Sequence, residues 1–252
     1  MKNSIHFALL PVILCVLFLG CQKNGSGPQT KNGEAAKPVE VTEIEIQTRE
    51  LSADEVQQLT EHLQKAYARE YGAGVKYEAW AEKAEKDGWK RIGALFRSIA
   101  KSESVHAERH AAALKVLGAT PVANIEIPEA GTVEEMLRKA AESEEEVVKI
   151  FYPALIAEFE KHPAAKDVTQ NCRSAMTNDE QHAELYRETL TNLPAWKDST
   201  APIAVCTVCG FIVEDEPPAI CPKCGAKKEE FEVRPAPAET KAEAETKAEK
   251  KP

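Results

Sequence analysis

Two short segments of this chain each place an acidic residue three positions before a histidine. They are Glu103-Ser-Val-His106 and Asp179-Glu-Gln-His182. Residues three apart lie on the same side of a helix, so each segment points a carboxylate and an imidazole in one direction. The neighbours at helical spacing are apolar, and this side is therefore expected to face a core. A buried, isolated carboxylate costs several kcal/mol, so these groups need a partner, for which a metal ion is the candidate.

Two further predicted helices each carry a single glutamate on the apolar side. Glu70 precedes Glu103 by 33 residues (103 − 70), and Glu144 precedes Asp179 by 35 (179 − 144), so the chain repeats one pattern twice. This is the arrangement of ferritin-like di-iron bundles. Four carboxylates and two neutral imidazoles balance the charge of two divalent cations, and these ligands suit iron or manganese. The alternative is that solvated Glu and His residues recur on charged helices, but the common register of all six groups favours metal.

Near the C-terminus, cysteines occur in two CxxC pairs, each followed by glycine: Cys206-Thr-Val-Cys209-Gly210 and Cys221-Pro-Lys-Cys224-Gly225. This spacing predicts one tetrahedral site of four thiolates, and the glycines let backbone N–H groups turn toward the sulfurs. Zinc ribbons share the spacing, so it does not by itself choose between iron and zinc. Bound metal would protect the thiolates from pairing in an oxidising compartment.

The bulk composition is that of a globular protein of one or two domains. The chain has 252 residues, of which 43% are hydrophobic and 29% charged, and its formal net charge is −9. No basic stripe is present to engage phosphates, which argues against nucleic-acid binding.

The first 20 residues have the form of a secretory signal. Lys2 is followed by an apolar run over residues 7–19, which is too short to span a bilayer. Phe18-Leu-Gly-Cys21 resembles a bacterial lipobox, so Cys21 is expected to be acylated and to become the mature N-terminus. An ordinary signal with an incidental cysteine is the alternative. A lipid anchor would hold the protein in the bacterial cell envelope, facing the periplasm or the exterior, and Gln22 favours the outer membrane of a Gram-negative host.

Capping boxes at Ser52-Ala-Asp-Glu55 and Thr132-Val-Glu-Glu135 predict the starts of two helices, and a kink is expected at Tyr152-Pro153. The predicted segments are a signal peptide (1–20), a flexible tether (21–48), a helical bundle (49–195), a cysteine domain (201–234) and a disordered tail (235–252).

The chain resembles the rubrerythrins. The likeness rests on Ala66-Tyr-Ala-Arg-Glu70, the two acid-x-x-His segments, Phe151-Tyr-Pro153 and both CxxC pairs, and it continues to about Val233. It implies a mainly α fold, in which a ferritin-like four-helix bundle precedes a small rubredoxin-like domain. It also favours iron over zinc at the cysteines.

The activity that this resemblance implies is the reduction of hydrogen peroxide to water. A di-iron centre would react with the peroxide, and the iron tetrathiolate centre would relay electrons from an unidentified NADH- or rubredoxin-linked donor. Glu103 and Asp179 would bridge the irons. The family also implies a head-to-tail homodimer, in which the thiolate centre lies near the partner's di-iron site. The implied terminal ligands are Glu70 and Glu144, with one histidine, His106 or His182, on each iron.

For several other residues an ordinary packing role is the alternative to a role at the metal site. Tyr77 and Tyr152 match family tyrosines that hydrogen-bond the ligand carboxylates, with core aromatics as the alternative. His110, one turn beyond His106, is expected to be a satisfied core or surface histidine, with support of the metal ligands as the alternative. Cys172 is expected to be a buried apolar filler.

Two positions depart from the family pattern. Val147 stands where rubrerythrins carry a seventh ligand, a glutamate, and Asp179 stands where they carry a longer glutamate. The six remaining groups are closer to those of ferroxidases and bacterioferritins. A ferroxidase or oxygen-reducing protein is therefore the first alternative, and a non-catalytic protein with a structural zinc ribbon is the second.

Overall fold

The computed structural model describes residues 44–197 and 199–235. The predicted signal peptide, Cys21, most of the tether and nearly all of the tail lie outside these residues. Within them, no helix has an apolar stretch long enough to cross a bilayer. The main elements are α1 (Ala53–Lys86), α2 (Lys90–Val116), α3 (Val133–Glu146), α4 (Tyr152–Phe159), α5 (Lys166–Thr191), α6 (Leu193–Lys197), β1 (Ile203–Cys206), β2 (Ile212–Glu214) and β3 (Phe231–Arg234).

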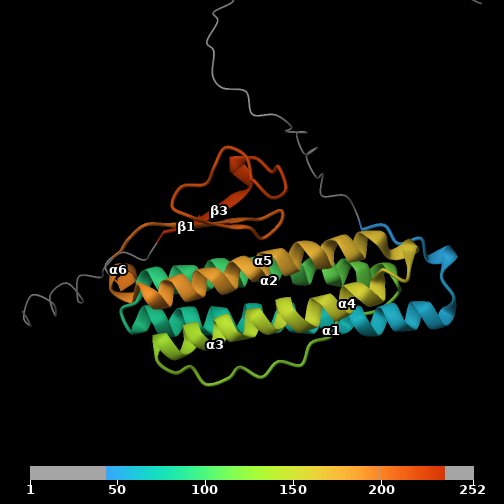
Figure 1. Ribbon diagram of the computed structural model, residues 1–252, viewed down its shortest axis with the longest axis horizontal. Helices are drawn as coiled ribbons and strands as arrows, with labels where there is room; N and C mark the ends of the chain where they lie inside the picture. Colours follow the sequence, from blue (N-terminus) through green and yellow to red (C-terminus); the bar gives the residue numbers. More distant parts are fainter. Residues whose placement is uncertain (1–43, 198, 236–252) are drawn as a thin grey trace, which may run out of the picture. The chain divides into compact units, whose positions relative to one another are not determined.

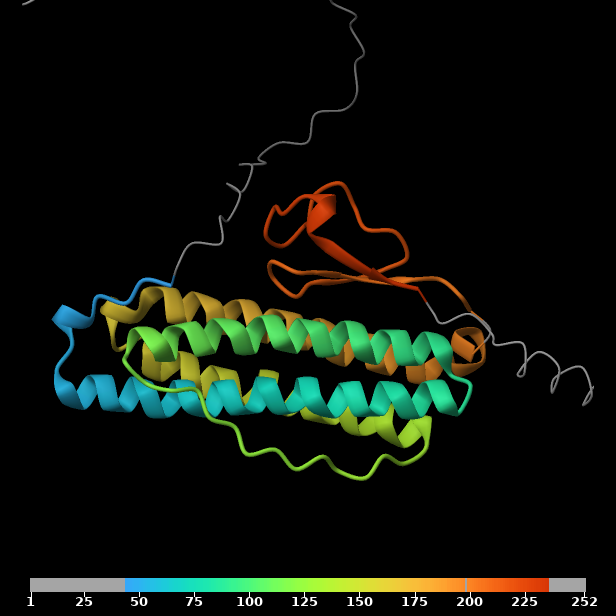
Figure 2. The ribbon, with the colours of Figure 1, turned by 180° about the vertical axis from the view of Figure 1, so that it is seen from behind.

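The long helices form the expected ferritin-like bundle. Helices α1 and α2 pack along each other, and α5 packs along the rod that α3 and α4 make together (Figures 1 and 2). The connection between α2 and α3 runs back along the length of the bundle (Figure 1). The pair α1 and α2 and the pair formed by the α3–α4 rod and α5 can therefore pack around one core. Both predicted capping boxes are present, at Ser52 and at Thr132. Gly88 (φ 83°) and Gly118 (φ 78°) follow the ends of α1 and α2 in the left-handed conformation that glycine tolerates best.

The rod formed by α3 and α4 contains a π-helical segment, Val147–Phe151. The sequence predicts a proline kink one residue later, at Tyr152-Pro153. Instead, Pro153 lies in the first turn of α4, where a missing N–H is tolerated, and the wider π turn precedes it.

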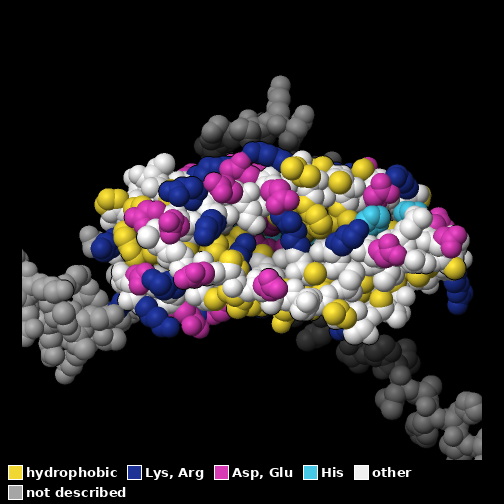
Figure 3. Space-filling view, turned by 90° about the horizontal axis from the view of Figure 1, so that it is seen from below, with side chains coloured by type: hydrophobic (Ala, Val, Ile, Leu, Met, Phe, Trp, Pro, Cys, Tyr) yellow, Lys and Arg dark blue, Asp and Glu magenta, His cyan; other side chains and the backbone are white. Residues whose placement is uncertain are grey.

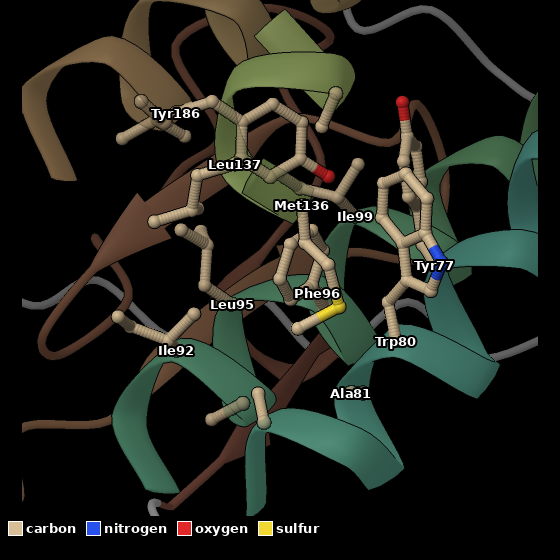
Figure 4. Close-up of a cluster of buried hydrophobic side chains, with 14 of the residues drawn as sticks. Tyr77, Trp80, Ala81, Ile92, Leu95, Phe96, Ile99, Met136, Leu137 and Tyr186 are labelled. Carbon is tan, nitrogen blue, oxygen red and sulfur yellow. The ribbon is translucent and has the colours of Figure 1, made fainter. Parts of the chain in front are cut away.

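One of the two hydrophobic clusters of the bundle contains a group of packed aromatic rings among its aliphatic side chains (Figure 4). The ring centroids of Tyr77 and Tyr186 are 5.6 Å apart, and Phe96 lies 5.4 Å from Tyr186. Trp80 packs edge-on to Phe96 at 5.9 Å. Pairs at these distances stabilise the core beyond the area that they bury.

The predicted tether ends earlier than residue 48. Ile46 is only 7% exposed and packs into the second hydrophobic cluster of the bundle, with Ile44 and Leu51 beside it. The backbone N–H of Gln47 donates to the carbonyl of Ala164 at 3.1 Å. Apolar side chains in an otherwise polar stretch give residues 44–51 a surface to bury.

The small C-terminal domain contains a three-stranded antiparallel sheet in the order β2-β1-β3. Val205 pairs with Ile212 on one side and with Glu232 on the other. The four cysteines lie next to this sheet. They form a small buried cluster of their own with Ala204 and Phe231.

Packing predicts the cost of removing a core side chain. Leu63 is 0% exposed in the bundle core, so Leu63→Ala should lower the free energy of unfolding by about 2–5 kcal/mol. Ile150 is 65% exposed, and Ile150→Ala should change it by less than about 0.5 kcal/mol. Urea unfolding of the metal-free protein measures both. Equal losses in the two variants would contradict the described packing.

Candidate metal centres

The bundle interior brings together all six acid and histidine side chains that the sequence singles out. Each is no more than 3% exposed. Their ligand atoms form two groups, within each of which all lie within 4.8 Å of one another. The groups share Glu103 and Asp179, which gives these two carboxylates the position expected of bridging ligands. The first group is Glu70, Glu103, His106 and Asp179, and the second is Glu103, Glu144, Asp179 and His182.

Both imidazoles turn the same ring nitrogen toward this centre. Nδ1 of His106 lies 3.3 Å from Glu70 Oε2 and 3.2 Å from Glu103 Oε2. Nδ1 of His182 lies 3.1 Å from Glu103 Oε1. The same nitrogens are each 3.7 Å from Asp179 Oδ1. Nδ1 is therefore the atom of each ring that faces the carboxylates.

The close approach of α1 to α2 positions these groups. A Cβ atom added at Gly74 would lie 3.3 Å from the carbonyl oxygen of Ala100 and 3.6 Å from Cβ of Glu103. That spacing leaves little room for a larger residue. The glycine that lowers helix propensity near Glu70 thus permits tight packing beside the site.

The protein atoms alone leave this cluster short of partners. Neither side-chain oxygen of Asp179 has a hydrogen-bond partner among the described residues, and Nε2 of His182 has none either. Burial raises the pKa of Glu103 to about 8 and that of Glu144 to about 7, and nearby carboxylates add to both effects. Burial also raises the pKa of Asp179 well above its ordinary value. Unpaired, buried carboxylate oxygens of this kind fit divalent cations, whereas Nε2 of His182 belongs to the ring edge that faces away from the cluster.

Two tyrosines hold the outer carboxylates. The Tyr77 hydroxyl donates to Oε1 of Glu144, and the Tyr152 hydroxyl donates to Oε1 of Glu70 at 2.5 Å. This is the arrangement that the family resemblance predicts. His110, expected to be an ordinary core or surface histidine, extends the second pair, because its Nε2 lies 3.2 Å from the Tyr152 hydroxyl. It is a buried part of the surroundings of the site.

Sequence reasoning missed other residues around this centre. Asn178 and Ser102 are buried on the far side of His106. Lys76 lies within 3.5 Å of Ser143 Oγ, with its ammonium group over the Tyr77 ring. The sequence does offer one signal for Asn178, because it is a polar residue directly before the expected ligand Asp179 in a helix with an apolar face. Lys76 gave none, because lysine is common on exposed helix faces.

A cavity of about 320 Å³ reaches the cluster from the face that carries α1 and α3. Carboxylates of the cluster line its inner part, and residues 124–126 of the α2–α3 connection form its outer wall. Lys and Arg side chains are interspersed with Asp and Glu on this face (Figure 3). Val147, which occupies the position of the usual seventh ligand, also lines the cavity.

The four cysteines of the small domain also form a ready metal site. The Sγ atoms of Cys206 and Cys224 are 3.7 Å apart, as are those of Cys209 and Cys221. Metal–sulfur bonds of about 2.3 Å in a tetrahedron give S–S edges of about 3.8 Å, so the described thiols fit such a site. Cys172 lies apart from them, fully buried in the bundle, and is the apolar filler that was expected.

Comparison with known proteins gives consistent matches over both parts of the chain. The Rubrerythrin family profile matches residues 61–190, and the profile of the rubrerythrin rubredoxin-like domain matches residues 205–232. Rubrerythrin-2 of Clostridium acetobutylicum is 31% identical over 173 residues, which are 68% of this chain and 93% of that protein. Nigerythrin of Nitratidesulfovibrio vulgaris is 29% identical over 176 residues, covering 68% of this chain and 84% of the relative.

The fold has a similar match among solved structures. Fully reduced, all-ferrous nigerythrin superimposes with a TM-score of 0.66 at 24% identity, covering 81% of this chain and all of that one (100%). This likeness supports the fold of bundle and small domain together.

The buried cluster predicts how the stability of the metal-free protein depends on pH. Glu103 and Glu144 keep protons up to pH of about 8 and 7, whereas the unfolded chain releases them near 4.5. Burial opposes the charge of His106, but hydrogen bonds to Glu103 and Glu70 outweigh it and raise its pKa to about 9. All three groups therefore bind more protons in the folded state, Glu144 mainly below pH 7 and Glu103 and His106 up to about pH 8 and 9. Stability should fall as pH rises from 7 to 9, chiefly through Glu103 and His106, by up to about 1.4 kcal/mol per pH unit for each proton.

Denaturant unfolding at several pH values measures this slope. Glu103→Gln should make it shallower, because a neutral amide has no proton to lose. Saturating ferrous iron under anaerobic conditions should raise the stability most at high pH, where the carboxylates are ionised. A metal-free protein equally stable at pH 7 and pH 9 would contradict the described burial of these groups.

Proposed function

Because this chain belongs to the rubrerythrin family and combines a di-iron carboxylate site with a rubredoxin-like four-cysteine site, we propose that it reduces hydrogen peroxide to water. The reaction takes up two electrons and two protons for each peroxide and yields two waters. The observation that carries the proposal is the presence, in one chain, of a buried six-ligand site and a four-thiolate site. The first suits two-electron chemistry, and the second suits electron supply one at a time.

We assign Glu103 and Asp179 as bridging ligands, with the other four side chains of the cluster as terminal ligands. Two irons held by these residues would provide the two electrons needed to cleave the O–O bond, and an iron held by the four cysteines would provide the electrons that replace them. The terminal ligands in this assignment are Glu70, His106, Glu144 and His182.

The surrounding residues keep the site dry and supply protons. Burial raises the pKa of Tyr77 and of Tyr152 well above the ordinary value, so both hydroxyls keep their protons and hold the carboxylates that they touch. Lys76 lines the cavity, and burial lowers the pKa of its ammonium group, against the opposing charges of Glu144 and Glu103. A lysine that releases its proton more readily, beside the path that a small substrate would take, suits proton delivery to the leaving oxygen.

A second candidate function is supported by Val147. This side chain is only 4% exposed and offers no ligand atom at the position of the seventh glutamate. A six-ligand site is also that of ferroxidases, so a protein that reduces dioxygen or oxidises ferrous iron would fit the same cluster. A non-catalytic role with zinc at the cysteines is the remaining alternative, and metal analysis of the protein as isolated distinguishes it.

Location and assembly complete the proposal. Acylation of Cys21 would anchor the protein in the cell envelope, where an electron donor of that compartment would reduce the thiolate centre. A head-to-tail homodimer, as the family resemblance implies, is part of this proposal. In the described chain the thiolate domain lies against the bundle of the same chain, where the Cys209 carbonyl accepts a hydrogen bond from Asn178. In a head-to-tail dimer the same contact would be made between the thiolate domain of one subunit and the bundle of the other.

Stopped-flow oxidation of the reduced, iron-loaded protein tests the activity. Peroxide should oxidise the bundle irons much faster than dioxygen does at equal concentration. Glu103→Ala should abolish this reaction and empty the bundle site, yet leave the visible sulfur-to-iron absorption of the thiolate centre. Glu108→Ala, an exposed carboxylate on the same helix, is the matched control and should react like the wild type. Faster oxidation by dioxygen would favour the second candidate, and full peroxide turnover in Glu103→Ala would refute the ligand assignment.

Membrane attachment has its own test. Cells fed a radiolabelled fatty acid should label the wild-type protein, which should sediment with membranes. Cys21→Ser should lose the label and move to the soluble fraction. Cys15→Ser, within the apolar run of the same segment, should keep the label. An unlabelled wild-type protein would reject the lipid anchor and leave the metal chemistry untouched.

A further inference from the structure

One buried amide lies between the two metal centres. Nδ2 of Asn178, on α5, donates to the backbone carbonyl of Cys209 and lies 3.1 Å from Nε2 of His106. The three residues are 1%, 3% and 2% exposed, respectively. Nε2 is the ring nitrogen that faces away from the carboxylates. Asn178 therefore contacts both a thiolate residue and the outer edge of a bundle histidine, out of contact with solvent.

The backbone next to the first cysteine pair, at Gly210, lies very close to this histidine. Gly210 has φ of 86°, and an added Cβ atom would lie 2.9 Å from Nε2 of His106 and 2.5 Å from Ser102 Oγ. A side chain at this position would force Ser102 or His106 to move, and the positive φ would strain it as well. Gly210 thus serves the approach to the bundle as well as the turn at the cysteines.

A second amide, one helical turn along, fixes the register of this contact. Gln181 donates from Nε2 to the carbonyl of Ile212 at 2.9 Å, and its Oε1 accepts from the N–H of Ile212 at 3.0 Å. It therefore pairs with the outer edge of β2 as a neighbouring strand would. Arg91 adds an ion pair with Glu214 at 2.8 Å. Gln181 and Arg91 can hold the small domain in place without Asn178.

We propose that Asn178 is a positioning residue for electron transfer: its amide holds the Cys209 carbonyl against the outer edge of His106 and so sets the path between the centres. This inference rests on the proposed function. In each transfer the thiolate centre loses one electron and the bundle centre gains one. Two transfers restore the bundle after each peroxide, and the electron donor of the proposed function reduces the thiolate centre again after each of them. Gln181 has a different role, which is to dock the domain.

The side chain present suits this role. An amide is neutral, so it adds no charge beside the buried carboxylates, and it is long enough to reach both neighbours. Alanine would leave the Cys209 carbonyl without its donor and open a gap where the two centres meet. Aspartate would keep the length but place an acceptor against the carbonyl oxygen of Cys209.

Asn178→Ala and Asn178→Asp test the proposal, with Gln170→Ala, an exposed amide on the same helix, as the matched control. Fully reduced, iron-loaded protein is mixed with peroxide, and the bundle and thiolate absorptions are followed separately. Gln170→Ala should keep the wild-type rate in both phases, and in each variant the oxidation of the bundle is the reference for the thiolate phase. The later oxidation of the thiolate centre should slow by about tenfold in the Asn178 variants, because the amide contact that closes the gap between the two centres is lost.

Hydrogen exchange of the Ile212 amide gives a readout that does not depend on turnover, with zinc at both sites. This amide should stay protected in Asn178→Ala and lose protection in Gln181→Ala. Wild-type thiolate oxidation in Asn178→Ala would overturn the proposal. Equal loss of Ile212 protection in the two variants would overturn it too, since Asn178 would then serve only to dock the domain.

The same two phases separate this inference from the proposed activity. If peroxide fails to oxidise the wild-type bundle, the proposed function fails, and the experiment is repeated with dioxygen as the oxidant. A thiolate phase that slows in Asn178→Ala under dioxygen would still support the positioning role. If the thiolate centre is not oxidised after the bundle under either oxidant, the positioning role of Asn178 is rejected.

Discussion

The structure depends on the burial of like charges in one small volume. Glu70, Glu103, Glu144 and Asp179 converge in the bundle interior with almost no exposure to water. Desolvation and mutual repulsion oppose the ionised form of most of them, as the raised pKa values of Glu103 and Glu144 express. Two divalent cations remove that opposition. The metal centre is thus both the site of chemistry and the element that lets four rods of this composition pack closely.

The residues around the cluster help to stabilise the buried carboxylates. Tyr77 and Tyr152 each donate to an outer carboxylate from helices that face one another, and His110 supports the second of these bonds. Tyr77, which donates to Glu144, also packs against the ring of Tyr186 at 5.6 Å, so the aromatic cluster lies next to the site. The carboxylate cluster itself opens into the cavity beside Lys76. An enclosed, hydrogen-bonded cluster with one polar opening can admit a molecule as small as peroxide while keeping bulk water away.

Much of this could be predicted from the sequence, because it follows from helical periodicity and motif spacing. The six acid and histidine residues share a register that only a bundle satisfies, and the cysteine pairs have the spacing of a tetrathiolate site. The capping boxes at Ser52 and Thr132 fixed two helix starts, since each is a local interaction over four residues.

Features that depend on contacts between distant segments were not predictable. Asn178, Lys76 and the second role of Gly210 depend on which side chain or backbone segment packs opposite, and no periodicity records that. The packing of Ile46 against the bundle was hidden by its polar neighbours. The assembly partner and the electron donor depend on contacts with other molecules, which helical periodicity and motif spacing do not encode.

The π-helical segment Val147–Phe151 has a consequence for the way this chain can vary. In an unbroken α-helix, eight residues turn a side chain by about 800°, which would place Tyr152 about 80° away from the direction of Glu144. The wider turn takes up most of that difference, so both side chains face the centre. Deleting a single residue here would restore regular helix and leave Glu144 and Tyr152 seven positions apart, about 700° of turn, so that both still face the centre. This stretch should therefore tolerate the loss of one residue, whereas the same deletion within α4, after Tyr152, would turn the residues beyond it by about 100°.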